Sequence, residues 1–221
     1  MELWFSECHA PDVKHSLRVN RHLYSKKSEY QQIDIFDTPE FGRVLALDGN
    51  VMLTERDEFI YDEMITHVPM SVHKNAKDIL VIGAGDGGVV KELTRYDRVE
   101  RIDLVEMDGE VIEACRAYLP ENACRLDDSR VHIYFDNALR FIRRCSNEYD
   151  LIIVDSNDPT VSNTERVNNV WQDHDKVSSL AVNRFRSNIH MAASGNYSVN
   201  FNGREFVREL DVLTSDELFS E

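Results

Sequence analysis

Four acidic residues of this 221-residue chain stand where side chains could do chemistry together. Asp86 lies inside a glycine-rich segment, Glu106 and Asp155 each follow a short apolar run, and Asp158 comes three residues after Asp155. Carboxylates hold cationic groups by charge, accept hydrogen bonds from hydroxyl groups and take protons from attacking nucleophiles. The pattern therefore predicts a site for a cationic substrate with acid–base chemistry beside it.

The glycine-rich segment Gly83-Ala84-Gly85-Asp86-Gly87-Gly88 satisfies the pattern GxGxxG. A buried-looking apolar run precedes it and a helix-like run follows it, as in the unit that binds nucleoside cofactors, with Gly83 and Gly85 beside the ligand. Glu106 lies 23 positions beyond Gly83, where an acid would meet ribose hydroxyl groups. The alternative is that these glycines only turn the chain.

The charge of Asp86 narrows the choice of nucleoside. A pyrophosphate packed on this turn would face a carboxylate, and like charges a few ångströms apart repel strongly in a partly dry site. A ligand with an ammonium or sulfonium charge would be stabilised there instead. Asp86 therefore favours a nucleoside of the S-adenosylmethionine type over NAD.

Asp136 and Asn137 follow a further apolar run, at a strand end where polar side chains would face the adenine. The side-chain oxygen of Asn137 could accept a hydrogen bond from the adenine amino group. The alternative interpretation is surface polarity without a ligand.

Asp155 and Asp158 suit a diamine substrate, because one carboxylate can take a proton from the attacking amine while the other holds the far cationic end. The unperturbed pKa of the amine should be that of lysine, ~10.4. Before the amine can attack, its pKa must therefore be lowered or its proton removed. Acids at strand ends also occur as helix caps, which is the structural alternative.

The elements that would position these residues form two regions. The first has short, partly alternating runs typical of antiparallel strands, followed by a helix that is expected to stop at Val68-Pro69. From Lys77 onward, apolar runs alternate with helix-like segments, which predicts a Rossmann-like α/β fold with a parallel sheet and a ligand crevice at its carboxyl ends. The predicted strands are 16–19, 31–36, 43–47, 79–82, 102–105, 131–135, 151–154 and 196–201, and the predicted helices are 58–67, 87–96, 109–118, 137–145, 182–193 and 205–218. We place the domain boundary at residue 70, giving an N-terminal β-hairpin domain over 1–70 and a nucleoside-binding domain over 71–221, with a long polar loop at 160–176.

Composition excludes several classes of function. The net charge of −15 argues against nucleic-acid binding, which needs clustered lysine and arginine, and it is compatible with a cationic substrate. No apolar run approaches the roughly 20 residues that a membrane span needs, and the N-terminus lacks the basic and apolar pattern of a secretion signal. Four scattered cysteines without a CxxC pair indicate no zinc site and no disulfide framework. We expect a reduced, cytoplasmic protein that is not bound to a membrane.

At this point the chain resembles the spermidine synthase family, the polyamine aminopropyltransferases. The resemblance covers roughly residues 1–159, and its motifs are jointly specific. The matching pieces are Glu2-Leu3-Trp4, Glu29-Tyr30-Gln31, FGRVLALDG at 41–49, TERDEFIYDEM at 54–64, HVP at 67–69, GAGDGG at 83–88, LVEMD at 104–108 and VDSNDP at 154–159.

The resemblance implies a methyltransferase-type fold, decarboxylated S-adenosylmethionine as co-substrate and putrescine or a similar polyamine as acceptor. It also implies a homodimer or homotetramer, with no prosthetic group and no metal. Carried over by position, the donor-binding residues would be Gln31, Gly83, Gly85, Asp86, Glu106, Asp136 and Asn137. Asp155 would be the general base, and Tyr61, Asp62, Asp155 and Asp158 would bind the acceptor side.

Four departures from the family pattern concern mainly the acceptor half. Position 62 is usually His or Gln in the family and is Asp62 here, and Asn137 replaces an adenine-contacting aspartate. The polar stretch 160–176 stands where a segment rich in glycine and proline is expected, and the strands that usually complete the sheet are not expected before Glu221. Two other functions therefore stay open: a catalytically impaired nucleoside-binding homologue or partner subunit, and a methyltransferase that uses S-adenosylmethionine.

Overall fold

A parallel five-stranded sheet forms the centre of the computed structural model, which describes residues 2–10, 12–145, 148–155 and 190–193. The strand order is β11-β10-β7-β8-β9, and all neighbouring pairs are parallel. The strands are β7 (Asp78–Gly83), β8 (Arg101–Glu106), β9 (Val131–Phe135), β10 (Leu151–Asp155) and β11 (His190–Ala193). The chain runs outward from β7 to β9 and then returns to β10, so the strand order reverses between β7 and β10. This is the switch point at which sheets of this kind bind ligands.

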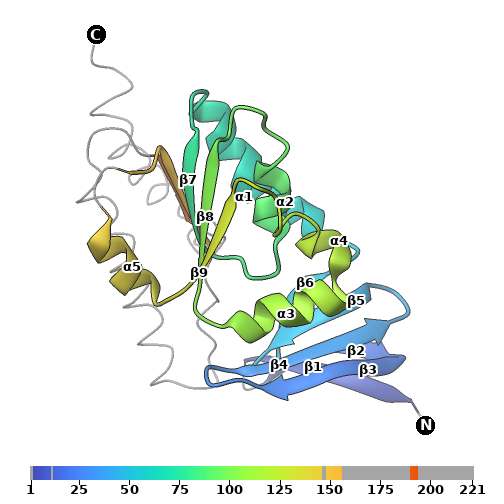
Figure 1. Cartoon of the computed structure of the whole chain (residues 1–221). Helices are drawn as coiled ribbons and strands as arrows, with labels where there is room; N and C mark the ends of the chain where they lie inside the picture. Colours follow the sequence, from blue (N-terminus) through green and yellow to red (C-terminus); the bar gives the residue numbers. More distant parts are fainter. Residues whose placement is uncertain (1, 11, 146–147, 156–189, 194–221) are drawn as a thin grey trace.

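Helices cover both faces of the sheet (Figure 1). They are α1 (Glu58–Val72), α2 (Gly88–Leu93), α3 (Gly109–Tyr118), α4 (Pro120–Ala123) and α5 (Ala138–Arg144). Alternate residues of β7 serve the two layers: Ile79 and Val81 join the core that contains α2 and α3, whereas Leu80 and Ile82 pack with α5. A strand that is apolar on both faces is what a parallel sheet between two helical layers requires.

The N-terminal region is antiparallel and lies beside α3 (Figure 1). A hairpin of β1 (Leu3–Ala10) and β2 (Val13–Val19) accompanies a four-stranded sheet of β3 (Arg21–Lys27), β4 (Gln32–Thr38), β5 (Gly42–Leu47) and β6 (Asn50–Thr54). Lys26 Nζ donates to Glu110 Oε2 at 2.6 Å, and the Arg43 side chain donates to the Tyr118 carbonyl. The region is therefore tied to α3 at both ends of that helix.

The predicted fold class is confirmed, with the parallel strands and helix α3 found at the expected places. Prediction missed β1, β3 and β6, and the domain boundary at residue 70 stays a prediction. The predicted loop 160–176, strand 196–201 and helix 205–218 lie outside the described residues. No helix in the described part of the chain is both long and apolar enough to cross a membrane.

Two predictions of helix bounds were wrong. Helix α1 does not stop at Pro69 but continues to Val72, because Met70 is buried and its carbonyl accepts a hydrogen bond from Arg98, while the Pro69 carbonyl accepts from His73 N. Residues 190–193 were predicted to end a helix but form β11, which pairs with β10 from His190 to Ala193. Pairing with a neighbouring strand outweighs local helix preference in that segment.

Candidate active site

The glycine-rich turn after β7 has a backbone that few other residues could adopt. Gly83 and Gly87 have φ of 81° and 95°, and Ala84 between them has φ of 57°. Such left-handed conformations cost a side-chain-bearing residue energy that glycine avoids. The turn closes with a hydrogen bond from Gly87 N to the Ala84 carbonyl at 3.0 Å, so its own backbone holds its shape.

The two other glycines of the motif make room for acidic side chains. A Cβ on Gly85 would lie 2.9 Å from Glu106 Oε2, and a Cβ on Gly88 would lie 1.9 Å from Asp62 Oδ2. The two carboxyl groups can approach the turn this closely only because positions 85 and 88 are glycines. Gly83 and Gly85 were predicted to lie beside the ligand, and the structure places both beside the predicted acids.

Asp86 lies in the turn and is held by its surroundings. Its Oδ1 accepts a hydrogen bond from Gly88 N at 2.8 Å. Burial nevertheless raises the pKa of Asp86, and the nearby charge of Glu58 adds to the increase. A bound cation would lower that pKa again and stabilise the carboxylate.

Glu106 ends β8 and is joined to the N-terminal region through Asp108. Glu106 Oε1 accepts from Asp108 N at 2.8 Å, and Asp108 Oδ2 accepts from Gln31 Nε2 at 2.9 Å and from Ser28 Oγ at 2.6 Å. Burial raises the pKa of Glu106 to about 7. Gln31 and Glu106, predicted to bind one ligand, thus belong to one hydrogen-bonded chain.

Asp108 is a residue that sequence reasoning missed. It is buried, and its Oδ1 also accepts from Glu110 N at 3.2 Å, which caps α3. The signal was an acid directly before a helix in the run LVEMD. The acid was visible, but its contact with Gln31, 77 positions away, was not.

Asp155 meets the glycine turn at the switch point of the sheet. It pairs with Gly83 across β10 and β7, and its carbonyl accepts from Ala84 N at 3.2 Å. The hydroxyl of Tyr61 on α1 donates to Asp155 Oδ1 at 2.8 Å. The structure therefore brings together the predicted base, the predicted tyrosine and the glycine turn. Asp158 lies outside the described residues.

Asp136 and Asn137 have local partners at the end of β9. Asp136 forms ion pairs with Arg140, at 3.6 Å, and with Arg144. Asn137 Oδ1 accepts from Arg140 N at 3.2 Å, which caps α5. Both side chains thus have partners within the protein. Their contact with adenine stays a prediction.

Asp62 is buried between α1 and α2, with 4% of its surface exposed. The Asp62 carboxyl group lies close to that of Glu58, one turn earlier on α1, and Lys91 Nζ on α2 donates to Glu58 Oε1 at 3.0 Å. Burial, the charge of Asp86 and the bond to Glu58 raise the pKa of Asp62 to about 10. Glu58 and Lys91 were not among the predicted site residues. The binding of the acceptor by Asp62 stays a prediction.

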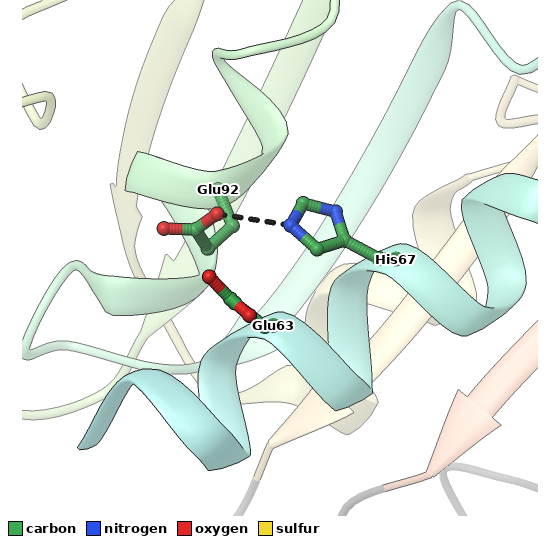
Figure 2. A group of neighbouring side chains, drawn as sticks. All are labelled: Glu63, His67 and Glu92. Carbon is green, nitrogen blue, oxygen red and sulfur yellow. Dashed lines mark ion pairs between the residues drawn. The ribbon is translucent and has the colours of Figure 1, made fainter. Parts of the chain in front are cut away.

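A second group of polar side chains joins the same two helices (Figure 2). The potential ligand atoms of Glu63, His67 and Glu92 lie within 4.8 Å of one another, as in a metal site. The guanidinium of Arg95, however, contacts Glu92 and lies 3.7 Å from Glu63 Oε1 and 3.5 Å from His67 Nε2. A cation of the protein already contacts both glutamates, so we assign this group to the packing of α1 on α2.

Two family models cover the described site and the strands before it. The spermidine synthase tetramerisation domain matches residues 3–55, and the spermine/spermidine synthase domain matches residues 58–174, more than half of the chain. The chain belongs to the spermine/spermidine synthase family. This confirms the resemblance that the motifs predicted.

Relatives and solved structures of the family agree with this assignment. The polyamine aminopropyltransferases of Clostridium botulinum and Lachnoclostridium phytofermentans are each 57% identical over 159 residues, which are 72% of this chain and 56% of theirs. A crystal structure of spermidine synthase with the transition-state analogue AdoDATO matches with a TM-score of 0.70 and 48% identity, covering 72% of this chain and 54% of that one. The spermidine synthase of Thermotoga maritima matches with a TM-score of 0.69 and 47% identity, covering 70% and 54%. The chain thus spans about half the length of the relatives it matches.

Proposed function

We propose that this protein transfers an aminopropyl group from decarboxylated S-adenosylmethionine to putrescine, giving spermidine and methylthioadenosine. The observation that carries the proposal is the contact of Tyr61 with Asp155 beside the turn that holds Asp86. It puts a potential base within reach of a nucleoside cradled by the glycine turn. The solved relative in complex with the transition-state analogue AdoDATO supports the same chemistry.

On the donor side, Asp86 would face the cationic end of the nucleoside and Glu106 would accept hydrogen bonds from its ribose. Gln31 would contact the donor from the N-terminal region, with Asp108 fixing its position. Asp136 and Asn137 would face the adenine. The raised pKa values of Asp86 and Glu106 fit groups that gain a hydrogen-bonding or cationic partner only when the ligand binds.

On the acceptor side, the amine nitrogen of putrescine would attack the carbon next to the sulfonium sulfur. A new C–N bond forms, the C–S bond breaks, and its electron pair stays on sulfur to give methylthioadenosine. Asp155 would take the proton that the amine loses, and Tyr61 would orient that carboxylate. Asp158 would hold the far cationic end of the acceptor, and Asp62 would line the acceptor side beside Tyr61.

The test is turnover by the purified protein with decarboxylated S-adenosylmethionine and putrescine, followed through methylthioadenosine. We expect product from the wild type and far less from Asp155→Asn. Binding of methylthioadenosine without turnover would replace the proposal with a nucleoside-binding homologue or partner subunit. Equal use of the carboxylated donor would point to methyl transfer instead.

We also propose that the protein forms a homo-oligomer, a homodimer or homotetramer, since residues 3–55 match a tetramerisation domain. Light scattering of the purified protein measures the mass of the assembly. A monomer at micromolar concentration would contradict this part of the proposal.

A further inference from the structure

Two carboxyl groups on α1 face each other inside the contact with α2. Glu58 and Asp62 lie one helical turn apart, on the same side of α1. Glu58 Oε2 and Asp62 Oδ2 are both fully buried, and no hydrogen-bond donor from the described residues reaches either atom. Buried polar atoms without a partner are rare and costly, so the pair needs an explanation.

A proton between the two carboxyl groups supplies the missing partner. The carboxyl groups of Asp62 and Glu58 lie close enough to share a hydrogen bond, but two ionised carboxylates have no hydrogen to place between them. Two carboxylates so close also repel each other, which favours retaining one proton. One proton therefore satisfies both otherwise unpartnered oxygens.

The surroundings assign this proton to Asp62. Glu58 stands in the first turn of α1, where the helix dipole favours a negative charge, and its Oε1 accepts from Lys91 Nζ at 3.0 Å. Asp62 instead faces the acids Asp86 and Asp155 as well as Glu58. Burial opposes the charge of Lys91, but its bond to Glu58 and the nearby acids raise its pKa, so it stays a cation.

We propose that Asp62 is a carboxylic acid in the working protein, donates its proton to Glu58, and thereby acts as a positioning residue for Tyr61 and Asp155. The neutral carboxyl group packs on Gly88, where a side chain would leave it no space. With Glu58 and Lys91 it fixes α1 to α2, and the neighbouring Tyr61 then reaches Asp155 at 2.8 Å. Its effect on turnover rests on the proposed function, whereas its protonation does not.

Proton linkage tests the protonation without any assay of activity. Folding should take up one proton because the carboxyl group is charged in the unfolded chain above pH 5 and neutral in the folded one. From pH 7.5 to 9, above the pKa of Glu106, the folding equilibrium constant of the wild type should fall about tenfold per pH unit more steeply than that of Asp62→Asn. Glu63→Gln, one position further on α1, is the matched control and should keep the slope of the wild type.

Infrared spectroscopy provides a second measurement where unfolding is irreversible. At pH 8 the wild type and Glu63→Gln should show the C=O band of protonated carboxyl groups, and Asp62→Asn should show that band weakened by one carboxyl group. Equal bands in all three proteins, or equal slopes in the unfolding experiment, would overturn the assignment of the proton to Asp62.

Kinetics test the positioning role. Asp62→Ala should lower kcat about tenfold or more with a smaller change in the KM of the donor, and Asp62→Asn should recover most of that loss as a neutral side chain that still donates. If Asn and Ala are equally impaired, the positioning role is wrong even when the protonation is confirmed. If the wild type itself shows no turnover, the proposed function fails while the linkage and infrared results still decide the protonation.

Discussion

Two groups of acidic side chains join the same pair of helices, and they differ in how their charge is compensated. The outer group consists of Glu63, His67 and Glu92 (Figure 2) together with Arg95, whose guanidinium contacts Glu92 and lies 3.7 Å from Glu63 Oε1. The inner group consists of Glu58, Asp62, Asp86 and Asp155 with Lys91. In the inner group burial raises the pKa values of Asp62 and Asp86, and the neighbouring acids add to the increase.

This difference suggests a different role for each group: the outer group holds α1 against α2, and the inner group belongs to the proposed active site. In the outer group each acid contacts a basic side chain, and the glutamates keep α1 on α2 without needing a ligand. In the inner group the cost of gathering carboxyl groups is met by a proton at Asp62 and, as we propose, by a cationic substrate at Asp86. Clusters of raised pKa values beside a turn that binds ligands are typical of active sites.

The largest expected effect is at the base. Asp155→Asn should lower kcat by roughly 10²–10⁴-fold, since the side chain can no longer accept the proton of the amine. Affinity for methylthioadenosine should change by only a few-fold, because the glycine turn and Glu106 are untouched. Turnover and calorimetric binding of the same preparation measure the two effects. An equal loss in both would mean that Asp155 mainly supports the nucleoside pocket.

A smaller loss is expected where the inner group meets the glycine turn. Gly88→Ala should destabilise the fold by about 1–3 kcal/mol, because the new methyl group overlaps the Asp62 carboxyl group. Thermal unfolding of Gly88→Ala, Asp62→Ala and the double variant forms a double-mutant cycle. The double variant should recover part of the loss, since removing the carboxyl group makes room. Strict additivity would show that the two side chains do not compete for space.

The pH dependence of nucleoside binding follows from Glu106. Its pKa is raised to about 7, and only the ionised form accepts hydrogen bonds from both ribose hydroxyls. Affinity for methylthioadenosine should therefore fall about tenfold between pH 8 and pH 6, and Glu106→Gln should remove this dependence. Stability has the opposite sign: the raised pKa contributes stability below pH 4.5 that is lost as the pH rises through about 7. Calorimetry and thermal unfolding over this range check both signs.

The placement of the glycine turn, Asp86 and Glu106 could be predicted from sequence because its signals are local. The glycines, Asp86 and Glu106 lie within one strand–turn–helix–strand unit, where spacing along the chain fixes position in space. Gln31 and Tyr61 came only from the resemblance, since each reaches the site through a partner 77 or 94 positions away.

Sequence could not predict the burial and the protonation of the acids on α1. The spacing of Glu58 and Asp62 puts both on one side of α1, but no pattern shows that this side is buried against Gly88. The end of α1 shows the same limit: a proline in the last turn predicts a stop, and only the burial of Met70 and its bond to Arg98 explain why the helix continues.

The smallest effect should come from the outer group. Glu63→Gln removes one partly exposed carboxylate that lies 3.7 Å from Arg95, and exposed ion pairs contribute only ~0.2–1 kcal/mol. Arg95 keeps its contact with the buried Glu92, so the melting temperature and turnover should both stay close to the wild type. Because the guanidinium already occupies this group, adding a chelator or zinc should not change the unfolding of either protein. A zinc-dependent rise in the melting temperature that Glu63→Gln abolishes would show instead that Arg95 can be displaced. The outer group would then be a metal site, and the contrast with the inner group would no longer separate packing from function.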